Sequence, residues 1–207
     1  YNGPASLPRI CRDVTPDTLK GNIIGVPVMS PFSFFTRSRS NNLDYEHLNL
    51  NRIWPGLEDG YLTQKAAKVV FDNVVKKADY VLDFHEGGIA IIAEYLGLSG
   101  TKDAHAKVGE TPRNMARWFG QGLPVIEKIT DSNQIALGRL GTMTEAAALL
   151  GVPSLTIEVG GAGKIWPDYV DTVVTGVKRI MIGLGMLGGK LPANDKPQHW
   201  VYDNQWM

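Results

Sequence analysis

The sequence is poor in cysteine and has no excess of either charge. Its single thiol, Cys11, excludes an internal disulfide framework and a cysteine-rich zinc site. Lys plus Arg number 21 and Asp plus Glu number 21, which gives a formal net charge of zero. That balance excludes a broad polyanion-binding surface and gives no reason to expect a nucleic acid as a partner.

Long apolar runs are also absent. The longest apolar stretch, residues 173–187, contains Lys178 and Arg179, so it is too short and too charged to cross a bilayer. No segment has the features of a signal peptide. We therefore expect a cytoplasmic protein that has no membrane partner.

The composition is that of a folded domain. Of the 207 residues, 43% are hydrophobic and 20% are charged, whereas a disordered chain shows the opposite balance. This length favours one domain over two. The 23 glycines and 12 prolines indicate many tight turns.

Strand-like and helix-like stretches alternate along the chain. Residues 31–51 are polar and irregular and predict a long loop. The alternation predicts an α/β fold, a three-layer α/β/α sandwich with a mixed, largely parallel sheet. The predicted strands are 22–29, 80–84, 124–129 and 154–159, and the predicted helices are 62–77, 113–119, 144–150 and 169–187.

Two chemically capable side chains lie at the carboxyl ends of predicted strands, where sites gather in such sheets. His85 follows a strand and precedes two glycines, so it is either a metal ligand or a hydrogen-bonded structural histidine. Glu158 is an acid inside an apolar strand, where a carboxylate must be paired or its pKa must rise. It is therefore either a general base or the partner of a core lysine or arginine.

The loop at residues 49–56 places Asn51 beside Arg52 and ends in Trp-Pro-Gly. A guanidinium fork next to an amide donor suits recognition of a carboxylate. The alternative for Arg52 is an ordinary surface ion pair.

Three glycines match the dinucleotide-binding pattern G-x-G-x-x-G, namely Gly183, Gly185 and Gly188. The match lies inside an apolar helical stretch, whereas a nucleotide site needs a strand before it and a helix after it. Close packing of helices is the better interpretation.

The other histidines carry weaker signals. His47 lies near Asn51 and is a candidate for ligand contact, His105 is expected to be solvated, and His199 lies in the tail. None is spaced as a metal partner of His85.

Three motifs in order resemble the succinylglutamate desuccinylase/aspartoacylase family of zinc carboxypeptidase-like hydrolases. LNLNRIWPG resembles the family's D/N-L-N-R-x-F-P-G loop, DFHEGG its strand-end motif with the third zinc ligand, and PSLTIEVGG its strand with the catalytic glutamate. The likeness runs from about residue 1 to residue 165, most of the chain.

The resemblance implies a role for each matching residue. His85 would be a ligand of one Zn²⁺ per intact enzyme, and Glu158 the general base and acid. Asn51 and Arg52 would hold the carboxylate of a small N-acyl amino acid. Arg39 would stabilise the developing oxyanion, with Arg37 as its rival. The implied activity is hydrolysis of an amide C–N bond that is not a peptide bond.

The sequence departs from the family in one respect. It lacks the H-G-x-E motif that supplies the first two zinc ligands, and the stretch that follows this motif in relatives resembles residues 1–5. We therefore expect a fragment: residues 1–191 as a partial catalytic domain and 192–207 as a connector towards a missing C-terminal β region, or as a strap over the core. Such a fragment alone is expected to be inactive and to bind zinc weakly.

Two rival functions stay open. A metallocarboxypeptidase would share the zinc, the glutamate and the Asn-Arg pair. A non-catalytic relative would keep the fold and use Arg52 to hold a carboxylate after losing its metal site.

Overall fold

The computed structural model describes residues 1–44, 47–131 and 141–202. Within these residues a five-stranded sheet has the order β1-β4-β2-β3-β5. The strands are β1 (Val81–His85), β2 (Ile92–Thr101), β3 (Val125–Thr130), β4 (Ser154–Gly161) and β5 (Trp200–Tyr202). The helices are α1 (Asn2–Asp13), α2 (Pro31–Thr36), α3 (Leu62–Asn73), α4 (Lys102–Val108), α5 (Thr111–Phe119), α6 (Met143–Leu149) and α7 (Pro167–Gly183), with short 3₁₀ turns η1 (Leu50–Arg52) and η2 (Val75–Lys77).

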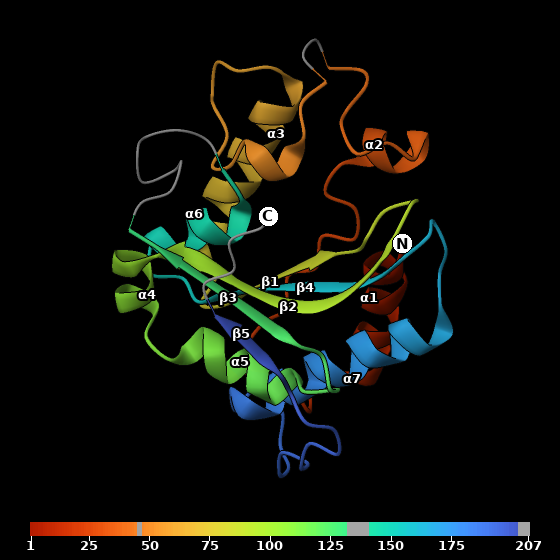
Figure 1. Ribbon diagram of the computed structural model, residues 1–207, viewed down its shortest axis with the longest axis vertical. Helices are drawn as coiled ribbons and strands as arrows, with labels where there is room; N and C mark the ends of the chain where they lie inside the picture. Colours follow the sequence, from red (N-terminus) through yellow and green to blue (C-terminus); the bar gives the residue numbers. More distant parts are fainter. Residues whose placement is uncertain (45–46, 132–140, 203–207) are drawn as a thin grey trace.

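Helices cover both faces of the sheet (Figure 1). Helices α1, α5 and α7 lie on one face, and α3, α4 and α6 lie on the other. Strand β1 pairs in parallel with β4, and β3 in parallel with β2 and β5, whereas β2 and β4 are antiparallel. The α/β/α sandwich with a mixed, largely parallel sheet is therefore confirmed. Among the described residues, no helix has both the length and the apolar character that a bilayer crossing requires.

The larger core lies between the sheet and the layer of α1, α5 and α7. In α7, Val170, Val173 and Val177 recur at helical spacing and are buried. They face a sheet whose central residues, such as Leu96 and Ile157, are fully buried. Burial of this face is what orders α7, since a helix in water gains most of its stability from packing.

Glycines let α7 approach α5 closely. A Cβ placed on Gly176 would lie 2.3 Å from the ring of Phe119, and one placed on Gly183 would lie 2.3 Å from the ring of Trp118. Gly183 ends α7, so a helix rather than a strand precedes the glycine pattern. Close helix packing at Gly183 is confirmed, and the strand-turn-helix context of a nucleotide site is missing there.

Several predicted elements differ in the structure. Residues 22–29, predicted as a strand, form no strand, and the predicted loop at 31–51 contains α2 and begins η1. Helices α1 and α4 and strands β2 and β5 were not predicted. In α1, Pro4 and Pro8 interrupt the apolar pattern, although Pro8 is tolerated inside the helix.

The tail packs on the domain as far as Tyr202. Strand β5 adds to the edge of β3, and Gln198 Nε2 donates to the Ala116 carbonyl over 3.0 Å. Arg179 is buried, donates from Nε to the Trp118 carbonyl over 2.8 Å, and hydrogen-bonds Asn194. Residues 194–202 thus cover α5 in the manner of a strap. The domain boundary at residue 191 and a further β region stay predictions.

The glycine contact gives a stability test. We expect Gly176→Ala to destabilise the fold by about 1–3 kcal/mol, because the added methyl group overpacks the site against Phe119. Helix propensity alone predicts the opposite sign, a gain of about 1 kcal/mol. The control is Thr175→Ala on the exposed side of α7, which should change the free energy of unfolding by less than about 0.5 kcal/mol. Urea unfolding of the variants decides between the two; a stabilised Gly176→Ala would contradict the packing argument.

Candidate functional site

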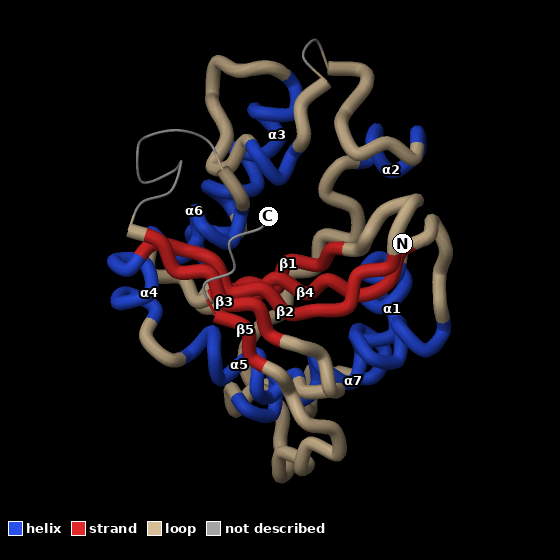
Figure 2. Tube along the Cα trace, viewed as in Figure 1, coloured by secondary structure: helices blue, strands red, loops and turns tan. Residues whose placement is uncertain are grey.

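The sheet register places three side chains side by side across its centre. His85 at the end of β1 is the partner of Glu158 on β4, and Tyr95 on β2 is the partner of the same Glu158 from the other side. Partners in adjacent strands point to one face of a sheet, and Asp83, two residues before His85, points there as well. Four polar side chains therefore gather on one face of β1, β4 and β2, whose arrangement can be followed in Figure 2.

His85 is held by Asp83. Its Nε2 lies 2.9 Å from Asp83 Oδ2, and 27% of its side chain is exposed. Burial alone would lower the pKa of His85, but the charge and hydrogen bond of Asp83, together with the charge of Glu158, outweigh burial and raise the pKa to about 9. Without a metal the imidazole is therefore protonated at neutral pH.

Glu158 is partly buried between β1 and β2. Burial is the largest cause that raises the pKa of its carboxyl group, and the charge of His85 opposes it. The hydroxyl of Tyr95 donates to Glu158 Oε1 over 3.4 Å, and burial together with Glu158 raises the pKa of Tyr95 to about 12. In the described chain no lysine or arginine forms an ion pair with Glu158. The core ion-pair alternative is therefore not what the structure shows.

The loop at residues 49–56 is anchored so that one side chain reaches His85. Asn51 accepts the Met143 backbone N–H at its Oδ1 over 3.2 Å, and its Nδ2 lies 3.2 Å from His85 Nε2. Trp54 is buried and exchanges backbone hydrogen bonds with Gly141. At Gly56, where φ is +85°, a Cβ would lie 2.3 Å from the backbone nitrogen of Lys68, so only glycine fits this turn.

The two predicted arginines border this cluster without an ion pair among the described residues. Arg52 is exposed and donates to the Asn51 carbonyl over 2.6 Å. Arg39 is exposed, and its charge lowers the pKa of both His85 and Glu158. Its rival Arg37, which caps α2 with a φ of 53°, is not among the main causes of either pKa shift. The structure brings Arg39, Asn51, His85 and Glu158 to one site, while their catalytic roles stay predictions.

The chain also matches a known protein family. The succinylglutamate desuccinylase/aspartoacylase catalytic domain matches residues 1–184. The chain belongs to this family.

Relatives in the family include one curated deacetylase. The N-alpha-acetyl-L-2,4-diaminobutyric acid deacetylase of Halomonas elongata is 26% identical over 201 residues, which cover 97% of this chain and 56% of the relative. The chain thus spans about half the length of that protein.

Solved structures show the same fold. A succinylglutamate desuccinylase from Silicibacter sp. TM1040 has a TM-score of 0.81 at 22% identity, covering 96% of this chain and 57% of the other. The product-bound ectoine utilization protein EutE (DoeB) from Ruegeria pomeroyi has a TM-score of 0.79 at 23% identity, covering 99% and 59%. At these identities the likeness establishes the fold.

The zinc site expected from the sequence is not complete among the described residues. Residues 1–44, 47–131 and 141–202 contain no group of three His, Cys, Asp or Glu side chains placed to hold a metal ion. His85 is the one imidazole at the site, and its Nε2 faces Asp83 and Asn51. These residues alone do not fit a zinc centre, which needs three protein ligands and an open position.

Two residues of the site were missed from the sequence, Asp83 and Tyr95. Asp83 lies two residues before His85 in a strand, a spacing that puts both side chains on one face and could have revealed it. Tyr95 is brought to Glu158 by antiparallel pairing between distant segments, for which the local sequence holds no signal.

Glu86, the neighbour of His85, has a structural task. Asn2 is fully buried, donates from Nδ2 to Glu86 Oε2 over 3.0 Å, and accepts the Trp166 backbone N–H at Oδ1 over 2.8 Å. Glu86 therefore ties the start of α1 to the loop that follows β1.

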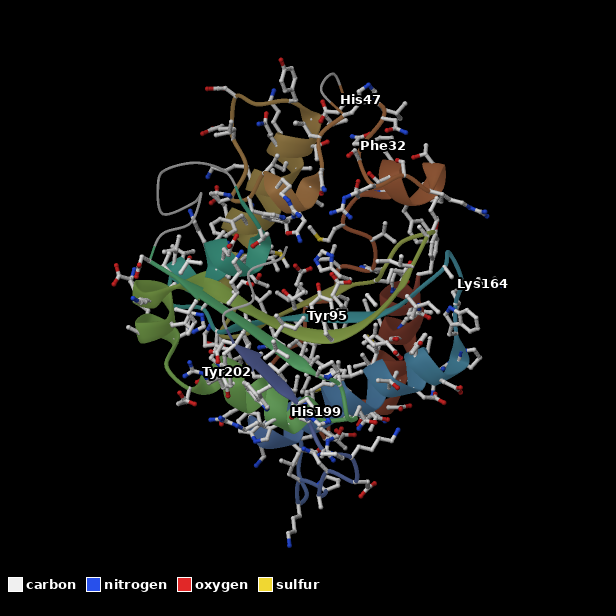
Figure 3. The ribbon with its side chains drawn as sticks, viewed as in Figure 1. Phe32, His47, Tyr95, Lys164, His199 and Tyr202 are labelled. Carbon is white, nitrogen blue, oxygen red and sulfur yellow. The ribbon has the colours of Figure 1, made fainter. Side chains whose placement is uncertain are left out.

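The remaining histidines lie away from this cluster. In Figure 3 Tyr95 marks the middle of the sheet, His47 lies in the distant loops near Phe32, and His199 lies beside β5. His105 was expected to be solvated, and this is wrong: only 15% of its side chain is exposed, because it packs 3.8 Å from the buried Glu127. Burial lowers the pKa of His105.

The His85–Asp83 contact predicts a pH dependence for the metal-free protein. The unfolded imidazole has a pKa of about 6.5. The folded value of about 9 means that the contact stabilises the fold fully below the unfolded pKa, and that this contribution is lost as the pH rises through the folded pKa.

Titration of the His85 ring by NMR in the presence of a chelator measures this pKa directly. Asp83→Asn should lower it, whereas Asp79→Asn, an exposed aspartate just before β1, should leave it unchanged. A wild-type ring that titrates near 6.5 would contradict the assignment.

Proposed function

We propose that this chain carries catalytic groups of an amide hydrolase that releases the acyl group from a small N-acyl amino acid. The observation that carries the proposal is the registered pair of His85 and Glu158 beneath the Asn51-Arg52 loop. Family membership and the deacetylase name of the Halomonas relative support the same reaction class. The activity, the substrate and the metal are all parts of this proposal.

Glu158 would move the proton. A general base works best when its pKa approaches the working pH, and burial of Glu158 shifts its pKa in that direction. The carboxylate would take a proton from the attacking water and then deliver it to the leaving amine. The Tyr95 hydroxyl, 3.4 Å from Oε1, would keep the carboxylate oriented between these two tasks.

Asn51, Arg52 and Arg39 would bind and orient the substrate. A guanidinium binds a carboxylate through two parallel hydrogen bonds, and Arg52 has donors left after its bond to the Asn51 carbonyl. Arg39 adds positive charge where the oxyanion would develop. This set favours an acid-bearing substrate small enough to reach from Arg52 to Glu158.

We propose His85 as one ligand of a zinc ion whose other ligands lie outside the described residues. Zinc would supply Lewis-acid activation of the attacking water there. Asp83, at 2.9 Å, would then keep the imidazole in position.

The missing ligands give a direct test on the 207-residue chain. We expect it to retain far less than one zinc after dialysis, since one imidazole does not make a zinc site of useful affinity. Elemental analysis of the dialysed protein, with His85→Ala as the blank, measures this. About one tightly held zinc per chain would overturn the expectation.

Glu158 is tested in the protein made from the complete open reading frame that contains this chain. There Glu158→Gln should lower kcat by about 10²–10⁴-fold, the usual contribution of acid–base catalysis, and leave zinc content unchanged. The matched control is Glu94→Gln, an exposed acid on the neighbouring strand β2, which should keep wild-type kcat.

The substrates for this assay separate the alternatives. N-acetyl-2,4-diaminobutyrate, N-succinylglutamate and N-acetylaspartate represent the deacylase, and a peptide with a free carboxyl terminus represents a metallocarboxypeptidase. Cleavage of the peptide alone would replace our proposal by the carboxypeptidase.

The absence of a complete ligand group among the described residues favours a second candidate, a carboxylate-binding relative. Binding of the acyl amino acids without turnover or zinc by the complete protein would support it.

A further inference from the structure

Strand β1 has one unpaired side. It pairs with β4, and no other described strand lies beside it. The Val81 N–H donates to the Pro153 carbonyl over 3.0 Å, so Val81 faces β4. Because backbone groups alternate sides along a strand, the N–H and C=O of Leu82 and Phe84 point away from β4. The sheet thus ends on a row of backbone donors and acceptors without a strand partner.

A cavity of about 1220 Å³ lies along this side of β1. Leu82 and Phe84 line it from the sheet. Residues of α1 and α7, such as Leu7 and Val177, line it from one face of the sandwich, and Val74 lines it on the side of α3. Residues of β1 and of both helical layers therefore line one cavity beside the unpaired edge of the sheet.

Residues 20–30, of which 21–30 lie in no helix or strand, also line this cavity. Residues 22–29 have the composition of a buried strand, yet Ile24 is 67% exposed and Val26 is 41% exposed. Among the described residues, no backbone group of residues 21–29 forms a hydrogen bond. A segment with strand composition and unpaired backbone therefore lines the same cavity as the unpaired side of β1.

We propose that this cavity is an acceptor site for one extended apolar peptide segment, which enters as a strand between β1 and residues 22–29. A strand is the occupant that satisfies both walls, since its N–H and C=O groups alternate between its two sides. Its side chains would meet helices on both faces, which suits valine and isoleucine, as in a buried parallel strand. The cavity borders the candidate hydrolase site, since Arg39 and Asp83 belong to its lining, but the inference does not require the chain to have activity.

Other occupants leave part of the site unsatisfied. An acyl chain would fill the apolar space but would leave both rows of backbone groups unpaired, which is costly once water is excluded. A second copy of this chain would have to bring its own β1 edge between helical layers that flank the cavity on both faces. The open edge itself favours pairing, as exposed edge strands do in general.

The test uses a synthetic peptide and amide exchange. The probe is an acetylated peptide with five central residues that alternate valine and isoleucine, and with lysines at both ends for solubility. Its matched control has the same sequence with N-methyl groups on every second central residue, which removes donors but keeps the apolar side chains. Hydrogen exchange is followed by NMR at the amides of Leu82, Phe84 and Ile24.

We expect the unmodified peptide to slow exchange at these three amides at least about tenfold, and the N-methylated peptide to have no such effect. Equal binding of both peptides without protection would mean an apolar ligand site and would overturn the proposal. Failure of the unmodified peptide to bind would overturn it as well. So would a dimer, seen by gel filtration, in which the β1 amides are already protected.

A pair of variants tests whether the peptide binds in the cavity. Ile24→Lys puts a charge on the cavity lining and should weaken peptide binding at least about tenfold. Ile165→Lys changes an isoleucine of similar exposure, 59%, that does not line the cavity, and should leave binding unchanged. Equal effects of the two variants would place the peptide elsewhere and contradict the proposal.

Discussion

The parallel pairing of β1 with β4 holds the candidate site together, because it sets His85 opposite Glu158. Side chains alternate faces along a strand, so a slip of one residue would send one of the two to the opposite helical layer. The buried residues of β4, among them Leu155 and Ile157, prevent that slip, since it would expose them to the polar face. Apolar packing on one face of the sheet thus fixes the spacing of ionisable groups on the other.

Segments far apart in the sequence converge on this pair. Asn51 reaches His85 because Met143 and Gly141 hold its loop against the start of α6. On the other side of the sheet, the buried Asn2 fastens α1 to Glu86, one residue beyond His85. The last residue of β1 is therefore restrained from both helical layers, which is how a strand end can present a side chain at a fixed position.

The sequence alone revealed a site residue where a reactive side chain interrupts a local apolar pattern. An acid in the apolar run 154–159 revealed Glu158, and the helix patterns of α3, α5, α6 and α7 were found with ends shifted by a few residues. It was silent where the structure depends on distant partners. Tyr95 is placed by antiparallel pairing with β4, and β5 is a three-residue strand that exists only because β3 offers an edge. Residues 22–29 show the converse, strand composition without a strand partner in the described chain.

The environment of His85 Nε2 combines opposite demands. Asp83 favours a proton on this nitrogen, whereas the Asn51 amide group, oriented by its Met143 contact, turns its own N–H donors towards it. If Nε2 carries a proton, it can donate to Asp83, but its N–H then faces the N–H donor of Asn51. If Nε2 has a free lone pair, it can accept from Asn51, but the lone pair then faces the carboxylate of Asp83. A metal-binding imidazole is neutral, so a cation bound at Nδ1 would replace the proton there while Asp83 keeps the proton on Nε2. The same carboxylates that raise the pKa of His85 to about 9 also create a potential that attracts a cation. The neighbouring Arg39 opposes this attraction, since its positive charge lowers the pKa of His85.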